Sequence, residues 1–179
     1  MSKENADKEQ KRSFKREVFS WIACIVVTIL LTEFILNFVI INANIPSGSM
    51  ENTIMTNDKL IALRTSYWFN DPKRGDIIIF KYPDDETEWF IKRVIALPGE
   101  TVLVKDGKVY INGSKKALSE PYIKEEPVED FGPYKVPKNG YFVMGDNRNN
   151  SNDAREWETH YVSRDEVLGK AWFRYYPSI

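Results

Sequence analysis

A continuous apolar run near the N-terminus constrains this chain more than any other feature. The run VFSWIACIVVTILLTEFILNFVII extends from Val18 to Ile41, and Glu33 is its single charged residue. This length matches the roughly 20 residues that an α-helix needs to cross a bilayer. The run therefore predicts a transmembrane helix over residues 18–41, which separates a polar tail (residues 1–17) from a domain (residues 42–179). Glu33 lies towards the outer end of this helix, where an interface position is expected rather than a functional site.

The charges that flank the run predict its orientation. Four basic residues precede it directly: Lys11, Arg12, Lys15 and Arg16. By the positive-inside rule, the N-terminus lies in the cytoplasm and everything after Ile41 lies outside the plasma membrane. A cleaved signal peptide, whose apolar part is ~7–15 residues long, is the alternative. Because the run continues from Phe34 to Ile41 without a clear small-x-small site after it, we expect a single-pass anchor in the lipid bilayer.

The composition excludes several classes of site and partner. The chain has 25 basic and 26 acidic residues, so it lacks the basic excess that is typical of nucleic-acid binding. Its single cysteine, Cys24, cannot form an intrachain disulfide. One cysteine and one histidine, His160, also exclude most zinc sites that are built from these ligands. We therefore expect no nucleic-acid partner, no metal and no cofactor.

The chain after residue 47 shows the pattern of short β-strands. Apolar or β-branched runs bounded by turn residues are found at Lys59–Leu63, Gly75–Tyr82, Glu88–Leu97, Thr101–Gly113, Tyr141–Gly145 and Leu168–Tyr176. Asp106-Gly107 is a strong hairpin signal. Together they predict a mainly β chain, in which a transmembrane helix precedes an all-β domain of antiparallel sheets arranged as a sandwich or barrel. Residues 114–139 hold four prolines and are expected to form an irregular surface excursion, with a role in substrate contact as the alternative.

Two serines flank a glycine shortly after the apolar run, in the segment NIPSGSMENT. Gly48 between Ser47 and Ser49 allows the close backbone approach that a nucleophile beside an oxyanion hole requires. A Ser-His-Asp triad would need His160, but no acidic residue is obviously placed to orient it. The alternative base is a lysine. A free lysine, with a pKa of ~10.4, is protonated at neutral pH and cannot accept a proton, so this lysine would need a pKa that is lowered by burial.

Lys92 is the candidate for such a lysine. In the strand Trp89–Leu97, Phe90, Lys92 and Val94 share one face, and both faces are largely apolar. The strand is therefore expected to be covered on both sides, which would bury the Lys92 amine. Arg93 stays protonated and needs a carboxylate instead. The alternative for Lys92 is a side chain that reaches solvent at the sheet edge.

The segment GDNRNNSNDAREW directly follows a predicted strand. Its polar residues can pin loops near a site through pairs of Asp146 with Arg148 and of Asp153 with Arg155, and Ser151 can orient a lysine amine. A purely structural turn is the alternative.

Four motifs follow the predicted membrane segment, in this order along the chain: IPSGSMENT, RGDIIIFKYP, FIKRVIALPGE and GDNRNNSNDAREW. In this order they resemble bacterial type I signal peptidases, over about residues 42–176. That family consists of Ser/Lys-dyad serine proteases, which remove signal peptides from exported preproteins on the outer side of the membrane. The resemblance implies substrates with small residues one and three positions before the cut.

The resemblance also implies roles for individual residues. Ser49 matches the nucleophile and Lys92 the general base, while Ser47 and the backbone N–H of Ser49 match the oxyanion hole. Ser151 matches a serine that hydrogen-bonds the lysine. The remaining motif positions match supporting polar residues: Asp146, Arg148, Asp153 and Arg155.

The chain departs from the family pattern at three positions. Asn52 replaces a proline, Ala154 a serine and Glu158 a glycine. The family pattern therefore does not predict the local loop geometry or the catalytic efficiency of this chain. Two other functions therefore remain: a catalytically inactive, membrane-tethered β-domain that binds exported chains, and a self-cleaving Ser/Lys peptidase. The membrane anchor argues against the self-cleaving peptidase.

Overall fold

A computed structural model describes residues 3–176 of the chain, and side-chain burial from residue 14 onward. The chain separates into two compact units after Val39. The first unit contains α1 (Lys3–Phe34), followed by a short π-helical segment (Ile35–Val39). Within it, the helical stretch Phe14–Val39 contains an 18-residue window with a mean hydropathy of 2.4, and by length and composition this stretch can cross a membrane.

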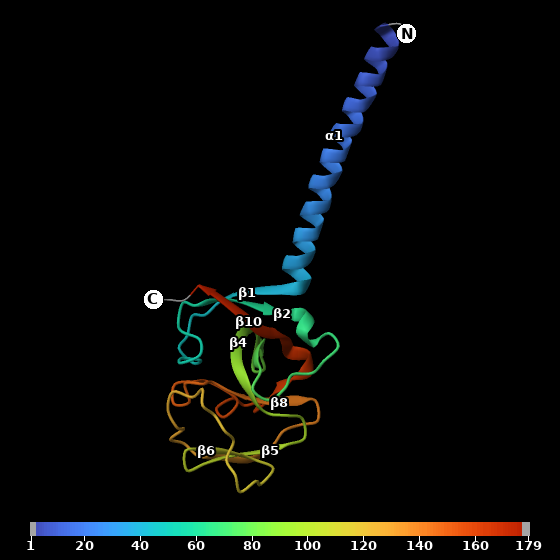
Figure 1. Cartoon of the computed structure of the whole chain (residues 1–179). Helices are drawn as coiled ribbons and strands as arrows, with labels where there is room; N and C mark the ends of the chain where they lie inside the picture. Colours follow the sequence, from blue (N-terminus) through green and yellow to red (C-terminus); the bar gives the residue numbers. More distant parts are fainter. Residues whose placement is uncertain (1–2, 177–179) are drawn as a thin grey trace. The chain divides into compact units, whose positions relative to one another are not determined.

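The second unit is built from two antiparallel sheets, which confirms the mainly β fold predicted from the sequence. The larger sheet has the order β1-β2-β10-β3-β4-β8-β9, and the smaller one the order β6-β5-β7. In Figure 1, β5 and β6 lie at the end of this unit away from β1 and β2. The larger sheet consists of β1 (Ile40–Asn44), β2 (Lys59–Leu63), β3 (Ile77–Tyr82), β4 (Asp85–Ala96), β8 (Gly140–Met144), β9 (Val162–Ser163) and β10 (Val167–Tyr176). The smaller sheet consists of β5 (Thr101–Lys105), β6 (Lys108–Ile111) and β7 (Phe131–Lys135), and two short 3-10 helices cover Arg64–Tyr67 and Arg164–Glu166.

Two parts of the structure differ from the boundaries expected from sequence. Ile40 and Ile41, the last residues of the apolar run, belong to β1, where they pair with Leu63 and Ala62 of β2. Within the segment expected to be irregular, residues 131–135 form β7 and pair with β5. The Phe131 ring packs against Phe142 of β8 in a tilted arrangement, so aromatic packing accompanies this strand.

The core consists of two apolar clusters, and β4 contributes to both. Val94 and Ala96 belong to the larger cluster, and Ile91 to the smaller one. The second half of β4, residues 91–96, is consequently buried throughout, as its apolar pattern on both faces predicted. Met50 is fully buried in the smaller cluster, which fixes the chain directly after Ser49.

Candidate active site

Ser49 lies in a compact turn, residues 48–54, that backbone hydrogen bonds hold together. The amide of Glu51 donates to the Gly48 carbonyl at 3.0 Å, and those of Thr53 and Ile54 donate to the Met50 carbonyl at 3.1 and 2.8 Å. Asn52 has a φ of 85°. Asparagine tolerates this left-handed conformation, whereas proline is restricted to a φ of about −65°. A proline at position 52, as in the family motif, could therefore not take the backbone conformation that Asn52 has here.

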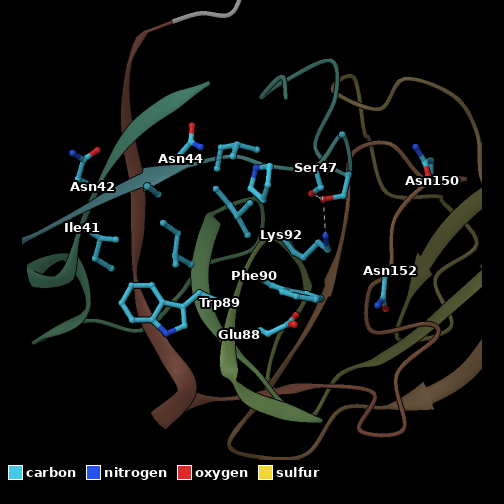
Figure 2. Close-up of a pocket in the computed structure, with 17 residues that line it drawn as sticks. Ile41, Asn42, Asn44, Ser47, Glu88, Trp89, Phe90, Lys92, Asn150 and Asn152 are labelled. Atoms are coloured by element: carbon cyan, nitrogen blue, oxygen red, sulfur yellow. Dashed lines mark hydrogen bonds between the residues drawn. The ribbon is translucent and has the colours of Figure 1, made fainter. Parts of the chain in front are cut away.

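The Lys92 amine reaches this turn from β4. Its Nζ donates a hydrogen bond to Ser49 Oγ at 2.6 Å, drawn as a dashed line in Figure 2. Both residues are buried, with exposed fractions of 4% for Lys92 and 6% for Ser49. Burial lowers the pKa of Lys92 from 10.5 to about 8, against an opposing effect of the Asp153 charge. With this pKa, a useful fraction of the amine would be neutral near pH 8, and only the neutral form can accept a proton.

The other two serines lie close to this pair. Ser47 Oγ is 3.5 Å from Ser49 Oγ, so its hydroxyl faces the same space. Ser151 Oγ is buried and has no hydrogen-bond partner among the described residues, so the predicted bond to Lys92 is not formed in this conformation. A side chain at Gly145 would collide with the Ser151 hydroxyl and the Ser49 carbonyl, which places Ser151 beside the Ser49 main chain.

Asp146 pairs with Arg93 rather than with Arg148, its expected partner. Arg93 Nε and Nη2 donate to the two carboxylate oxygens of Asp146 at 2.8 and 2.6 Å. The cause is the register of β4 and β8: Arg93 lies opposite Met144, so the residues that follow β8 run alongside Arg93. Arg148 instead donates two hydrogen bonds to Glu120, at 2.9 and 2.7 Å.

The second predicted pair is present. Arg155 Nε lies 2.9 Å from Asp153 Oδ1, and its Nη2 lies 2.9 Å from Asp153 Oδ2. The amide of Gly145 also donates to Asp153, at 2.9 Å. The Asp153 side chain therefore links the two ends of the loop that runs from Gly145 to Arg155.

Two residues that sequence reasoning missed hold the Ser49 turn. The amide of Asn147 donates to the Ser49 carbonyl at 3.1 Å, and its side chain donates to the Gly48 carbonyl at 3.0 Å. At the other end of the turn, the Thr53 hydroxyl donates to Asp146. The polar density of the motif around Asn147 was a signal for such contacts, but it gave no indication of the partner.

His160 is engaged elsewhere. Its Nδ1 lies 2.8 Å from the Ala154 carbonyl, and its ring packs edge-on against Phe131 and Tyr134. These contacts give no support to a Ser-His-Asp arrangement around Ser49.

A groove of about 700 Å³ opens beside the Ser49–Lys92 pair. Figure 2 shows its two walls, which come from residues 41–49 and from residues 88–92 of β4. Apolar side chains such as Ile45 and Ile91 supply much of the lining, and Glu88, Asn150 and Asn152 add polar groups. Among the described residues, no cluster of three or more His, Cys, Asp or Glu side chains is placed to hold a metal ion.

Comparisons with known proteins identify a family for this chain. A family model described as signal peptidase, peptidase S26, matches residues 18–176. A probable signal peptidase I-2 of Synechocystis sp. is 44% identical over 157 residues, which cover 85% of this chain and 70% of the relative. The signal peptidase I of Bacillus amyloliquefaciens is 35% identical over 179 residues, which cover 94% of each chain. A crystal structure of a signal peptidase I from Enterococcus faecalis V583 is 36% identical and covers 56% of this chain and 97% of that one, with a TM-score of 0.49. This chain belongs to the signal peptidase family S26 and is a serine-type peptidase.

Proposed function

We propose that this chain is a membrane-anchored signal peptidase that removes N-terminal signal peptides from exported preproteins. Family membership and relatives with that name support the substrate class. The apolar stretch Phe14–Val39 supports the anchor. The basic residues before it support a cytoplasmic N-terminus and a catalytic domain on the outer side of the plasma membrane.

Ser49 is the proposed nucleophile and Lys92 the proposed general base. The observation that carries this assignment is the 2.6 Å contact between Lys92 Nζ and Ser49 Oγ in a buried setting. The neutral amine accepts the hydroxyl proton as Oγ attacks the scissile carbonyl, and the resulting ammonium donates that proton to the leaving amine. Water then attacks the acyl-enzyme with Lys92 again as base, which releases the signal peptide with a free carboxylate.

The oxyanion of the tetrahedral intermediate needs donors that are already in place. The Ser47 hydroxyl and the backbone N–H of Ser49 are the proposed donors. The 3.5 Å separation of the two hydroxyl oxygens supports this role for Ser47. Preorganised donors of this kind stabilise developing negative charge without reorganisation during the reaction.

The substrate is proposed to lie in the groove beside Ser49, with small residues one and three positions before the cut. The groove is lined by Ile45, Ile79 and Ile91, among others, and these side chains are themselves buried. A larger substrate side chain would have to displace them, and overpacking of this kind costs ~1–3 kcal/mol.

The test is cleavage of a preprotein by the full chain in detergent, comparing the wild type with Ser49→Ala and Lys92→Arg. Both variants should lose cleavage, since alanine has no hydroxyl and a guanidinium stays protonated. His160→Ala serves as the control and should retain most activity, because its ring packs against β7. An active Lys92→Arg together with an inactive His160→Ala would refute the dyad. A wild type without turnover would favour an inactive binding domain.

A further inference from the structure

We propose that Glu120 and Tyr122 are positioning residues for the turn that carries Ser49, an inference that rests on the proposed function. Both belong to the segment 114–139, whose sequence suggested a solvated surface loop. Their side chains enter the polar network that holds the Ser49 turn.

Tyr122 contacts this network at Arg93. The Arg93 guanidinium lies over the Tyr122 ring, 3.8 Å from its centroid. Arg93 follows Lys92 on β4, and alternation along the strand directs the two side chains to opposite faces. Arg93 binds both carboxylate oxygens of Asp146, and the Asp146 side chain is fully buried. Tyr122 therefore covers one face of the cation that fixes Asp146.

Asp146 and its neighbour connect this contact to both ends of the Ser49 turn. Asp146 accepts a hydrogen bond from the Thr53 hydroxyl at the far end of the turn. Asn147 holds the carbonyls of Gly48 and Ser49 at the near end. A shift of residues 146–147 would consequently move the Ser49 hydroxyl relative to Lys92.

Glu120 fixes the same loop from its other side. It accepts two hydrogen bonds from Arg148 and a third from the Tyr122 hydroxyl, at 3.0 Å. The Arg148 side chain is fully buried, and its Nε donates to the Gly145 carbonyl at 3.0 Å. Because desolvation offsets much of the attraction in a buried ion pair, such a pair adds little net stability. Its contribution here is a fixed position for residues 145–148.

A third contact comes from the same segment. The amide of Lys124 donates to the Asp146 carbonyl at 3.3 Å, and its Nζ lies 3.0 Å from Glu51 of the Ser49 turn. The segment 120–124 thus contacts Arg93, the loop 145–148 and the turn itself. None of these contacts involves a residue of the groove walls, residues 41–49 and 88–92, so the segment bears on the position of the reacting groups rather than on substrate binding.

The experiment compares Tyr122→Leu with Tyr134→Leu in the full chain in detergent, with a preprotein as substrate. Tyr134 lies in the same segment and is also half-buried, but its ring packs on Phe131, Phe142 and His160. We expect Tyr122→Leu to lower kcat about 10- to 100-fold, the range for a misplacement of about 1 Å. KM should stay within about three-fold of the wild-type value. Tyr122→Phe keeps the ring face that contacts Arg93, so its kcat should also lie within about three-fold of the wild-type value.

Hydrogen exchange supplies a readout that does not depend on turnover. The amides of Glu51, Thr53 and Ile54, which bond within the turn, should exchange faster in Tyr122→Leu than in Tyr134→Leu. If the leucine variant does not fold, Tyr122→Met takes its place in both measurements. Equal losses of kcat in the two leucine variants, or unchanged exchange in the turn, would overturn the inference. A wild type that cleaves no preprotein would refute the proposed function, while exchange would still test the positioning.

Discussion

Replacing Lys92 by methionine should stabilise the fold while it abolishes cleavage. The Lys92 amine is buried in the folded structure, and this burial lowers its pKa from 10.5 in the unfolded chain to about 8. Methionine has a similar length and carries no charge. The variant therefore removes a group that the folded state holds at a cost in free energy.

The size and pH dependence of that cost follow from the two pKa values. A difference between 10.5 and about 8 corresponds to about 3 kcal/mol, at about 1.4 kcal/mol for each pKa unit. Since the folded state binds the proton more weakly than the unfolded state, the cost is fully present below pH 8. It declines as pH rises from about 8 to 10.5, and it vanishes at higher pH. The difference between the variant and the wild type should thus fall from about 3 kcal/mol at pH 7 to about 1 kcal/mol at pH 10.

Urea unfolding followed by tryptophan fluorescence measures this difference, with Trp157 in the core as one of the reporters. The lost bond to Ser49 and the altered packing add a contribution that does not depend on pH. The change between pH 7 and pH 10 is therefore the quantity to compare, rather than the absolute values. A difference in unfolding free energy that stays constant over this range would show that the Lys92 amine keeps an ordinary pKa and would refute the desolvation argument.

Three further predictions concern the proposed reaction and its location. Ser47→Ala should lower kcat ~10²–10³-fold with little change in KM, which is the effect of losing one oxyanion donor. Steady-state kinetics measures this, and a change in kcat of only a few-fold would contradict the role of Ser47 as a donor. Peptides with Ala directly before the cut should be cleaved faster than peptides with Phe there, and equal rates would contradict a narrow site. A reporter fused after residue 179 should be accessible from outside the cell, whereas protection of the domain from added protease would contradict the orientation.

Local pattern accounts for most of the fold that could be predicted. The β-branched run before Lys81 and the turn Asp106-Gly107 correspond to β3 and to the β5–β6 hairpin, because both depend on residues close in sequence. β7 was missed because its formation depends on pairing with β5, about 30 residues earlier, and on burial of Phe131. Its own residues, FGPYK, include a glycine and a proline, which disfavour a strand.

The site could be predicted only as far as single strands and motifs allow. Burial of Lys92 followed from the apolar pattern of β4, but the partner of Asp146 did not follow from spacing. That partner, Arg93, depends on the register between β4 and β8, which sequence spacing does not contain. The contributions of Glu120 and Tyr122 were equally invisible, because charged and proline-rich residues surround them.

The contrast between Lys92 and its neighbour Arg93 explains how one strand can carry the proposed base beside a permanent cation. Arg93 meets the Asp146 carboxylate in a two-point contact, so its charge is fully compensated. The Lys92 amine faces Ser49 and the Phe90 ring, and the carboxylate that most opposes its loss of charge is Asp153. Asp153 is already bound through both oxygens by Arg155, whose own charge lowers the pKa of Lys92. The loop after β8 therefore favours a neutral Lys92, since the nearby carboxylate has its counter-charge in place and burial dominates the pKa.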